Sequence, residues 1–234
     1  MTRTIHEQIT LDLRLLDAAR TGNLPAAMSA LEAGADINGT DEKSRTPLMH
    51  AALSGDADMV DFICRKGADV NAEDIDGDTA LMLAALADRA DIISHLFLQG
   101  ASLDHQDLWG HTALIRCSFR NKPKAAAFLI GAGASPDIRN KTGRTALIYA
   151  AIENNGTIAH ALLRGGASLE PVDDYSKSAL DYAGPELQRL IADYRKAKAE
   201  DEENAAREEM RNVRRKITRL GSARPISPRL RRIP

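Results

Sequence analysis

Apolar residues along the chain fall into short runs that come in pairs and return at a constant interval. The first runs of the pairs, LMHAAL, LMLAAL, LIRCSF and LIYAAI, begin at residues 48, 81, 114 and 147, a step of 33 residues. A few polar residues separate each of them from a second apolar run, such as MVDFICRKG or IISHLFLQG. A fixed period of this length indicates a repeat protein, and the pattern predicts two helices of about nine residues in each unit.

Two further landmarks share the 33-residue step and mark where these helices begin and end. A hydroxyl residue precedes each first helix, where it can cap free backbone amides: Thr46, Thr79, Thr112, Thr145 and Ser178. A glycine follows each second helix, where only glycine enters the left-handed conformation without strain: Gly34, Gly67, Gly100, Gly133 and Gly166. Between glycine and cap, Asp- and Gly-rich stretches such as ASLDHQDLWGH predict turns that return the chain to the next helix.

The unit TPLMHAALSGDADMVDFICRKGADVNAEDIDGD and the one after it resemble the ankyrin repeat, and the resemblance covers roughly residues 13 to 195. It implies an all-α solenoid in which helix pairs stack and the Asp/Gly turns project as fingers. Methionine or isoleucine replaces the usual histidine after each TPL or TAL triplet, and Arg116 and Ser118 predict a less regular fourth unit. The predicted units are 13–45, 46–78, 79–111, 112–144, 145–177 and 178–195, with polar end caps.

Partners of ankyrin-like stacks usually bind the fingers and the concave face of the first helices. Carried over by position, the resemblance implies a protein-binding surface at Arg45, Ile75, Asp76, Asp78, Leu86, Leu108, Trp109, His111, Phe119, Arg120, Lys141, Arg144, Ile152, Tyr175 and Lys177.

Trp109, the single tryptophan of the chain, is predicted at the tip of the central finger. Two interpretations stay open: an aromatic anchor for a partner, or a ring folded flat against Ile75 or a neighbouring finger. Tyr149 and Tyr182 are weaker candidates for partner contact, because helix positions that look inward are more often core, and Phe97 and Phe128 in the second helices are predicted to be buried.

Other chemistry finds little support in the sequence. DIDGD at residues 74–78 lacks the Gly and Glu spacing of a calcium loop. His105, Asp107 and His111 match no metal-ligand spacing, and no phosphate loop or nucleophile motif is present. We therefore expect no cofactor, no metal and no catalysis. Two cysteines give no disulfide framework, and neither a signal peptide nor a transmembrane segment is evident, so a cytoplasmic protein is expected.

The C-terminal part differs in pattern and charge. The last 50 residues hold 14 Lys/Arg and 8 Asp/Glu, whereas the first 184 hold 17 and 25. We predict that a helix closes the stack and continues as a charged extension over residues 196–220, with a basic tail at 221–234 that is disordered when alone. The leading hypothesis is a non-enzymatic protein-interaction module, acting as an inhibitor, immunity protein or adaptor. The alternative is a nucleic-acid-associated recruiter, in which residues 211–234 contact nucleic acid or an acidic protein.

Overall fold

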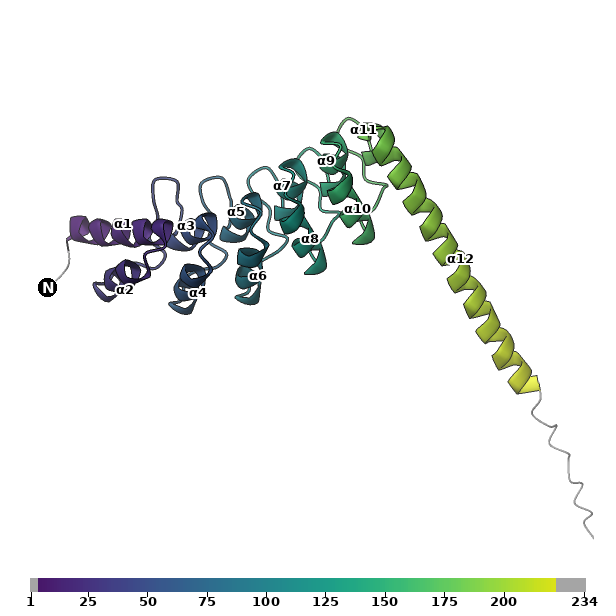
Figure 1. Cartoon of the computed structure of the whole chain (residues 1–234), viewed down its shortest axis with the longest axis horizontal. Helices are drawn as coiled ribbons and strands as arrows, with labels where there is room; N and C mark the ends of the chain where they lie inside the picture. The colour runs from purple at the N-terminus through teal and green to yellow at the C-terminus, as the bar shows by residue number, and fades with distance from the viewer. Residues whose placement is uncertain (1–3, 222–234) are drawn as a thin grey trace, which may run out of the picture. The chain divides into compact units, whose positions relative to one another are not determined.

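The computed structural model describes residues 4–221, with side chains through residue 212, and it is entirely helical apart from its turns. Within that range no strand forms, and the single β-bridge joins Val172 to Ser178. The helices, labelled in Figure 1, are α1 (Ile5–Thr21), α2 (Leu24–Glu32), α3 (Pro47–Ser54), α4 (Ala57–Arg65), α5 (Ala80–Leu86), α6 (Ala90–Leu98), α7 (Ala113–Phe119), α8 (Pro123–Gly131), α9 (Ala146–Ile152), α10 (Gly156–Arg164), α11 (Ala179–Tyr182) and α12 (Pro185–Gly221). The all-α prediction is confirmed.

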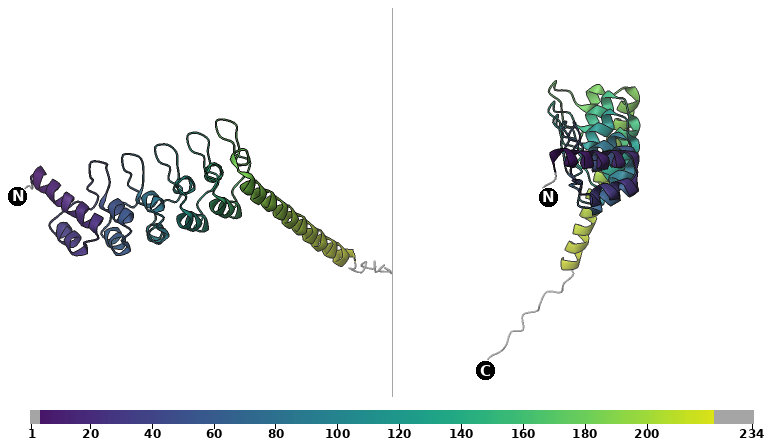
Figure 2. Two further views of the ribbon diagram at one scale, coloured as in Figure 1. Left: turned by 45° about the horizontal axis from the view of Figure 1, so that its top comes forward. Right: turned by 90° about the vertical axis from the view of Figure 1, so that its left-hand side faces the viewer.

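The chain up to residue 190 forms one compact unit made of stacked helix pairs. The first helices α3, α5, α7, α9 and α11 contact one another in sequence, and so do the second helices α4, α6, α8 and α10. Figure 2 shows the two helical layers of this unit, with the turns projecting in a row on one side. We call these turns the fingers.

The predicted caps of the first helices are confirmed by their hydrogen bonds. The hydroxyl of Thr112 accepts from the backbone amide of Ile115 at 3.2 Å, and Thr46, Thr79 and Thr145 do the same in their own units. Ser178 differs, because its hydroxyl donates to the carboxylate of Asp181 at 2.7 Å. The caps set the start of each helix at the same place in every unit.

The prediction that a glycine in the left-handed conformation follows each second helix is confirmed as well. Gly100 has a φ of 90°, and the following amide, that of Ala101, donates to the carbonyl of Leu96 at 3.0 Å. This bond closes the helix terminus in the manner of a Schellman motif. A side chain added at Gly100 would meet nothing within 4 Å, so only the backbone conformation requires glycine there.

Gly100→Val should therefore lower the free energy of unfolding by about 1–3 kcal/mol, the cost of holding a β-branched residue at positive φ. Urea denaturation measures it. The control is Gly131→Ala, at the end of α8, where φ is not positive and a Cβ also meets nothing within 4 Å. That variant should be neutral or more stable. Equal midpoints for Gly100→Val and wild type would refute the conformational role of this glycine.

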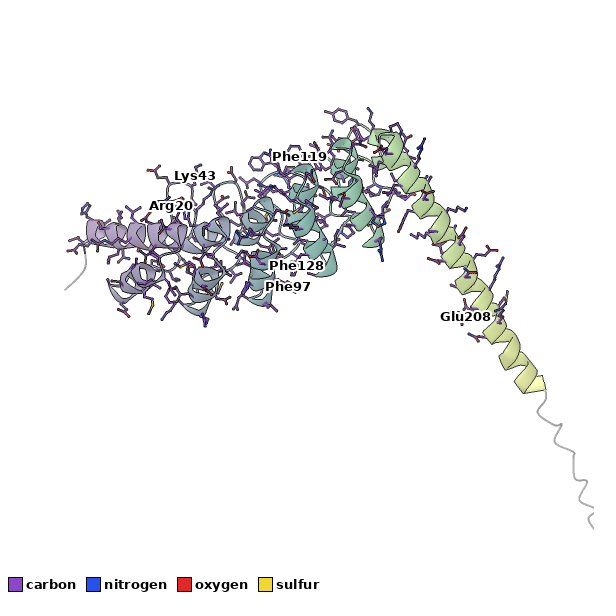
Figure 3. The ribbon with its side chains drawn as sticks, viewed as in Figure 1. Arg20, Lys43, Phe97, Phe119, Phe128 and Glu208 are labelled. Carbon is purple, nitrogen blue, oxygen red and sulfur yellow. The ribbon has the colours of Figure 1, made fainter. Side chains whose placement is uncertain are left out.

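The core runs through both helical layers at the 33-residue step. In the second helices Ile63, Leu96, Leu129 and Leu162 are each 0% exposed, and we call these four residues the second-helix ladder. The prediction that Phe97 and Phe128 are buried is wrong: Phe97 is 39% exposed and Phe128 is half-buried. Phe97 follows the ladder residue Leu96 by one residue and Phe128 precedes Leu129 by one, and one helical step of about 100° in either direction turns the side chain away from the core. Figure 3 shows both on the side of the stack opposite Phe119.

The fourth unit is as regular as its neighbours, so the predicted irregularity at Arg116 and Ser118 is wrong. Helix α7 spans seven residues, in register with α5 and α9. Ser118 is fully buried, and its hydroxyl donates to the carbonyl of Leu114 at 3.0 Å, which satisfies it inside the helix. Arg116 points instead toward the fingers, as described below.

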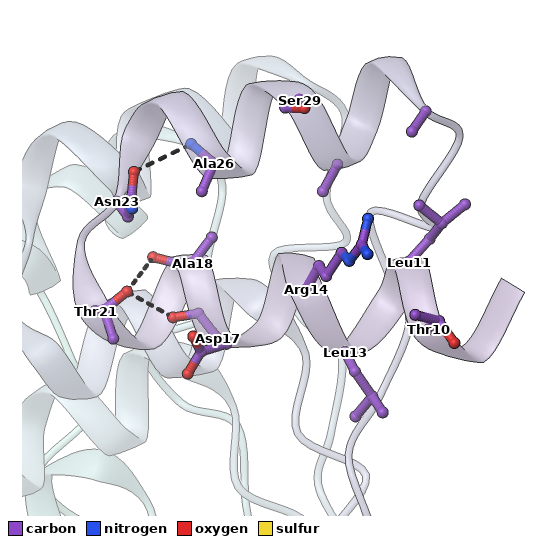
Figure 4. A pocket seen from close by; sticks show the side chains of 12 residues that line it. Thr10, Leu11, Leu13, Arg14, Asp17, Ala18, Thr21, Asn23, Ala26 and Ser29 are labelled. Atoms are coloured by element: carbon purple, nitrogen blue, oxygen red, sulfur yellow. Dashed lines mark hydrogen bonds between the residues drawn. The ribbon is translucent and has the colours of Figure 1, made fainter. Parts of the chain in front are cut away.

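The N-terminal end of the stack is a modified unit. Helix α1 begins at Ile5, eight residues before the predicted unit boundary, and Ala30 occupies the position of the second-helix ladder. A shallow hollow of about 520 Å³ results between α1 and α2 (Figure 4). Its rim carries the exposed Arg14 and Asp17, and the Thr21 hydroxyl donates back to the carbonyl of Asp17 at 2.8 Å. Leu13, 55% exposed, also lines the hollow, so this end of the stack presents both polar and apolar side chains.

Helix α12 spans Pro185–Gly221, and the chain from residue 191 forms a second unit. Its described side chains beyond residue 194 are exposed, with ion pairs one helical turn apart, such as Glu203 to Arg207 at 2.6 Å. The predictions about the tail at 221–234 and its nucleic-acid or acidic contacts lie outside the described side chains. None of the helices within residues 4–221 is long and apolar enough to cross a membrane.

Candidate partner-binding site on the finger side

Each finger is shaped by one acidic or amide side chain at its base. These residues recur at the 33-residue step: Asp41, Asp74, Asp107, Asn140 and Asp173. The carboxylate of Asp107 accepts the backbone amides of Trp109 and His111, both at 2.8 Å. The other four residues accept the equivalent pair of amides. The turn chemistry of Asp and Asn therefore fixes the backbone that carries each finger tip.

Neighbouring fingers are joined by backbone hydrogen bonds. The amide of Leu108 donates to the carbonyl of Asp76 at 3.1 Å, and that of Lys141 donates to the carbonyl of Trp109 at 3.0 Å. Ile75 with Lys43, and Asp174 with Thr142, repeat the bond. A Cβ at Gly110 would lie 2.9 Å from the Lys141 nitrogen, so glycine permits this close approach. The fingers thus form a continuous, fixed row.

A side chain from the first helix holds the base of most fingers. The residues concerned share the 33-residue step: His50, Arg116, Tyr149 and Tyr182. Tyr182, for example, donates its hydroxyl to Asp173 at 2.7 Å. Leu83 occupies this position in the third unit and cannot do so, and Arg45 binds Asp74 instead, at 3.2 Å. The supporting role of these residues was not predicted from the sequence, although the polar ones share the 33-residue step of the caps.

Arg116 connects two fingers. Its guanidinium donates to Asp107 through Nε at 2.9 Å and through a second nitrogen, and it lies 2.8 Å from Oδ1 of Asp78. Asp78 is 4% exposed, so little of this side chain is open in the free chain, and its contact with a partner stays a prediction. The Arg116 nitrogen and Oδ1 of Asp78 are close enough for an ion pair, but their geometry is not that of a hydrogen bond, and Oδ1 has no other donor. Asp78 therefore carries a buried and incompletely satisfied charge.

The pKa values of the two carboxyl groups around Arg116 are shifted in opposite directions. Burial raises the pKa of Asp78 to about 6, and the nearby carboxylates of Asp74, Asp107 and Asp76 add to the rise against the lowering effect of Arg116. Burial also acts on Asp107, but hydrogen bonds from Arg116 and from the amides of His111 and Trp109 outweigh it and lower the pKa of that group. Arg116 is therefore mainly the partner of Asp107.

Asp78→Asn should change how stability depends on pH. Because the pKa of Asp78 in the folded state, about 6, exceeds the value of about 3.9 in an unfolded chain, folding favours the protonated carboxyl. The stability it contributes is present below about pH 4 and is lost as the pH rises through about 6. The asparagine variant should gain stability relative to wild type over this interval, as measured by urea midpoints. If the urea midpoints of the two proteins change with pH in the same way, the raised pKa of Asp78 is contradicted. Asp174→Asn, which changes an exposed acidic residue of the last finger, is the control.

Beside Arg116 lies a pocket of about 320 Å³, which we call the Trp109 pocket. Its lining consists of Asp76, Asp78, Leu86, Trp109, His111, Ile115, Arg116, Phe119 and Arg120. Trp109 is 49% exposed and Phe119 is 44% exposed, whereas Ile115 is buried. Seven of these residues are among the contact residues predicted from the sequence, and Ile115 and Arg116 are not. An apolar pocket with a few polar groups is the usual form of a recognition site.

An aromatic row leads from this pocket into the next unit. The ring centroid of Trp109 lies 6.4 Å from that of His111, and His111 and Phe119 lie 6.0 Å and 5.6 Å from Tyr149. Tyr149, a weaker candidate in the sequence because inward helix positions are more often core, is half-buried and bounds this row, and Tyr182 is half-buried as well. The indole of Trp109 therefore stacks on His111 and keeps half of its surface open.

The remaining predicted contact residues divide by exposure. Six of them are exposed: Ile75, Leu108, Arg120, Lys141, Tyr175 and Lys177. Ile152 is 36% exposed, between the exposed and the half-buried residues. Arg45 and Arg144 are half-buried and bind Asp74 and Asp173, at 3.2 Å and 3.1 Å. These two arginines therefore support finger bases.

The groups considered for metal binding have other partners. His105 lies 3.0 Å from the carbonyl oxygen of Gly77, and His111 lies 3.2 Å from Asp107, which Arg116 also binds. In residues 4–212 no group of three or more His, Cys, Asp or Glu is placed to hold a metal ion.

Burial raises the pKa of the Cys64 thiol to about 11 and that of Cys117 to about 12.

A comparison with protein-family models matches the family described as Ankyrin repeats (3 copies) to residues 15–107, 81–173 and 113–194. These matches overlap and cover the whole stack of helix pairs. No curated protein matches the chain. Ankyrin repeats are in general non-enzymatic scaffolds for protein–protein interaction. From the 33-residue units, their capped helix pairs and this match, we conclude that the chain belongs to the ankyrin repeat family.

Proposed function

We propose that this chain binds a protein partner through the finger row and the Trp109 pocket. The observation that carries the proposal is the pocket itself, which is about 320 Å³ in volume and bounded by two half-exposed aromatic rings, Trp109 and Phe119. Aromatic and arginine side chains at the centre of a surface contribute most to protein–protein affinity. The pocket lies between the second and third of the fingers that begin at Asp41.

The exposed finger residues support the same proposal. Ile75 is 54% exposed, Leu108 56% and Tyr175 72%, so folding gains little from their apolar surface. Exposed apolar side chains on neighbouring fingers, such as Ile75 and Leu108, are typical of interaction sites. The hydrogen bonds within and between fingers hold these side chains on a fixed backbone. A partner therefore meets a surface that need not be ordered on binding.

In this proposal the chain acts by binding its partner and not by catalysing a reaction. An inhibitor, an immunity protein or an adaptor each needs only a rigid surface complementary to its partner, and we propose that the chain acts in one of these ways. We place it in the cytoplasm, where the two free thiols Cys64 and Cys117 stay reduced. Nothing in the described residues favours the nucleic-acid alternative over this one.

Trp109→Ala should weaken partner binding by about 2 kcal/mol or more, roughly thirtyfold, and leave stability nearly unchanged. The loss arises because the indole forms a pocket wall, while its half-exposed ring contributes little to folding. Native extract passed over immobilised wild type identifies candidate partners, and titration of a purified partner then measures affinity. Urea denaturation measures stability.

Phe97→Ala is the matched control, since this ring is 39% exposed but lies on the opposite side of the stack (Figure 3). Proteins captured by wild type and by Phe97→Ala, and lost with Trp109→Ala, are the expected result. If all three baits retain the same proteins with equal affinity, the partner site is elsewhere and the proposal fails.

A further inference from the structure

Resting on the proposed function, we propose that the Trp109 pocket receives one basic side chain, lysine or arginine, of the partner protein. Its cationic end lies against the carboxylates of Asp76 and Asp78, and its aliphatic stem lies between the pocket walls. A volume of about 320 Å³ is at the lower end of ligand pockets, which suits one long side chain rather than a folded element.

The first observation behind this proposal is the unsatisfied oxygen of Asp78. The Asp78 side chain lines the pocket and keeps 5% of its surface exposed, and its Oδ1 lies 2.8 Å from an Arg116 nitrogen but accepts no hydrogen bond in good geometry. Buried carboxylate oxygens normally accept hydrogen bonds, so this oxygen is incompletely satisfied. Rotation about the Cβ–Cγ bond exchanges the two oxygens, so a donor arriving through the pocket can reach the carboxylate. A partner N–H would supply what the free chain lacks.

The second observation is the local charge. Four carboxylates gather around the base of the pocket, those of Asp74, Asp76, Asp78 and Asp107. Three guanidinium groups oppose them: Arg45 binds Asp74, Arg116 serves both Asp107 and Asp78, and Arg120 lines the pocket. Four carboxylates against three guanidinium groups leave an excess of one negative charge, and Asp76 is half-buried. A cation entering here gains from both carboxylates, whereas an acidic side chain would be repelled.

The walls suit the stem of such a side chain. Leu86 and Ile115 provide apolar surface, and the rings of Trp109 and Phe119 offer faces on which a cation or its methylene chain can lie. One face of the Phe119 ring already carries Arg120, whose guanidinium carbon is 4.8 Å from the ring centroid. Arg120 is exposed and forms no ion pair with Asp76 or Asp78, so it leaves these carboxylates available.

The test uses the full chain and capped pentapeptides with glycine on both sides of one varied residue: lysine, arginine, norleucine, tyrosine or glutamate. The chain has a single tryptophan, so intrinsic fluorescence reports on the pocket directly. Lysine and arginine peptides should bind saturably and about tenfold or more tighter than the norleucine peptide. That ratio corresponds to one charge-assisted hydrogen bond.

Asp78→Asn and Asp76→Asn should each reduce this preference by about threefold or more, while Asp174→Asn, on the last finger, should leave it unchanged. The Asp76 variant keeps the test valid if Asp78→Asn alters folding. Equal or tighter binding of norleucine or tyrosine overturns the inference but leaves the proposed function standing. No response to the cationic peptides, or a preference that survives both variants, also overturns it. The proposed function itself fails only when Trp109→Ala does not change partner capture.

Discussion

Arg116→Leu should lower the free energy of unfolding by about 3–5 kcal/mol, one of the two largest effects expected in this chain. The substitution keeps the apolar volume of the side chain within the helix but removes the cation that serves two fingers. Asp107, 5% exposed, and Asp78, 4% exposed, would then be buried as neighbouring carboxylates without their partner. Urea denaturation at pH 7 measures the loss.

Arg120→Leu is the matched control, because Arg120 is four residues further along the chain and exposed. It should change stability by less than about 0.5 kcal/mol. Adding Asp78→Asn to Arg116→Leu should recover part of the lost stability, since one of the two stranded charges disappears. A loss below about 1 kcal/mol for Arg116→Leu would mean that water reaches these carboxylates and that the fingers do not depend on the arginine.

The second large effect is expected at the second-helix ladder. Leu129→Ala should cost about 2–5 kcal/mol, because Leu129 is 0% exposed and its removal leaves a cavity between neighbouring helix pairs. Phe128→Ala removes more atoms one residue earlier but from a half-buried position, so it should cost less than Leu129→Ala. Urea or thermal denaturation of the two variants side by side measures the difference.

The order of these two effects is the decisive result. If Phe128→Ala destabilises the chain more than Leu129→Ala, the aromatic side chain packs more closely than its half-exposed surface indicates. The orientation of the second helices described above would then be wrong. Leu96→Ala, at the equivalent position one unit earlier, provides an internal control and should match Leu129→Ala to within the spread of core substitutions.

The features that could be predicted from the sequence are those fixed by local chemistry. A threonine hydroxyl caps the helix that follows it, and Gly100 ends the helix that precedes it, whatever the neighbouring units are. Both follow from residue type at one position, and repetition every 33 residues made them unmistakable. The position of Trp109 on an exposed finger followed from the same register.

The features that could not be predicted depend on how one unit meets the next. Phe97 and Leu96 are both apolar neighbours, and only the packing of α6 against α4 and α8 decides which of them is buried. Asp78 resembled an open finger residue until its contact with Arg116, 38 positions later, placed it in the interior. Reading the polar residues of the first helices at the repeat interval would have exposed this pairing, because Arg116 shares the register of His50 and Tyr182.

The shared arginine also bears on how such an array can evolve. Units joined only by identical backbone bonds can be duplicated, lost or exchanged, since each new junction reproduces the old one. The junction at Arg116 is different, because Asp78, Asp107 and Arg116 come from three successive units. A crossover that brought a leucine like Leu83 opposite Asp78 would leave that carboxylate stranded. Recombination should therefore be selected against at this junction, where the Trp109 pocket lies.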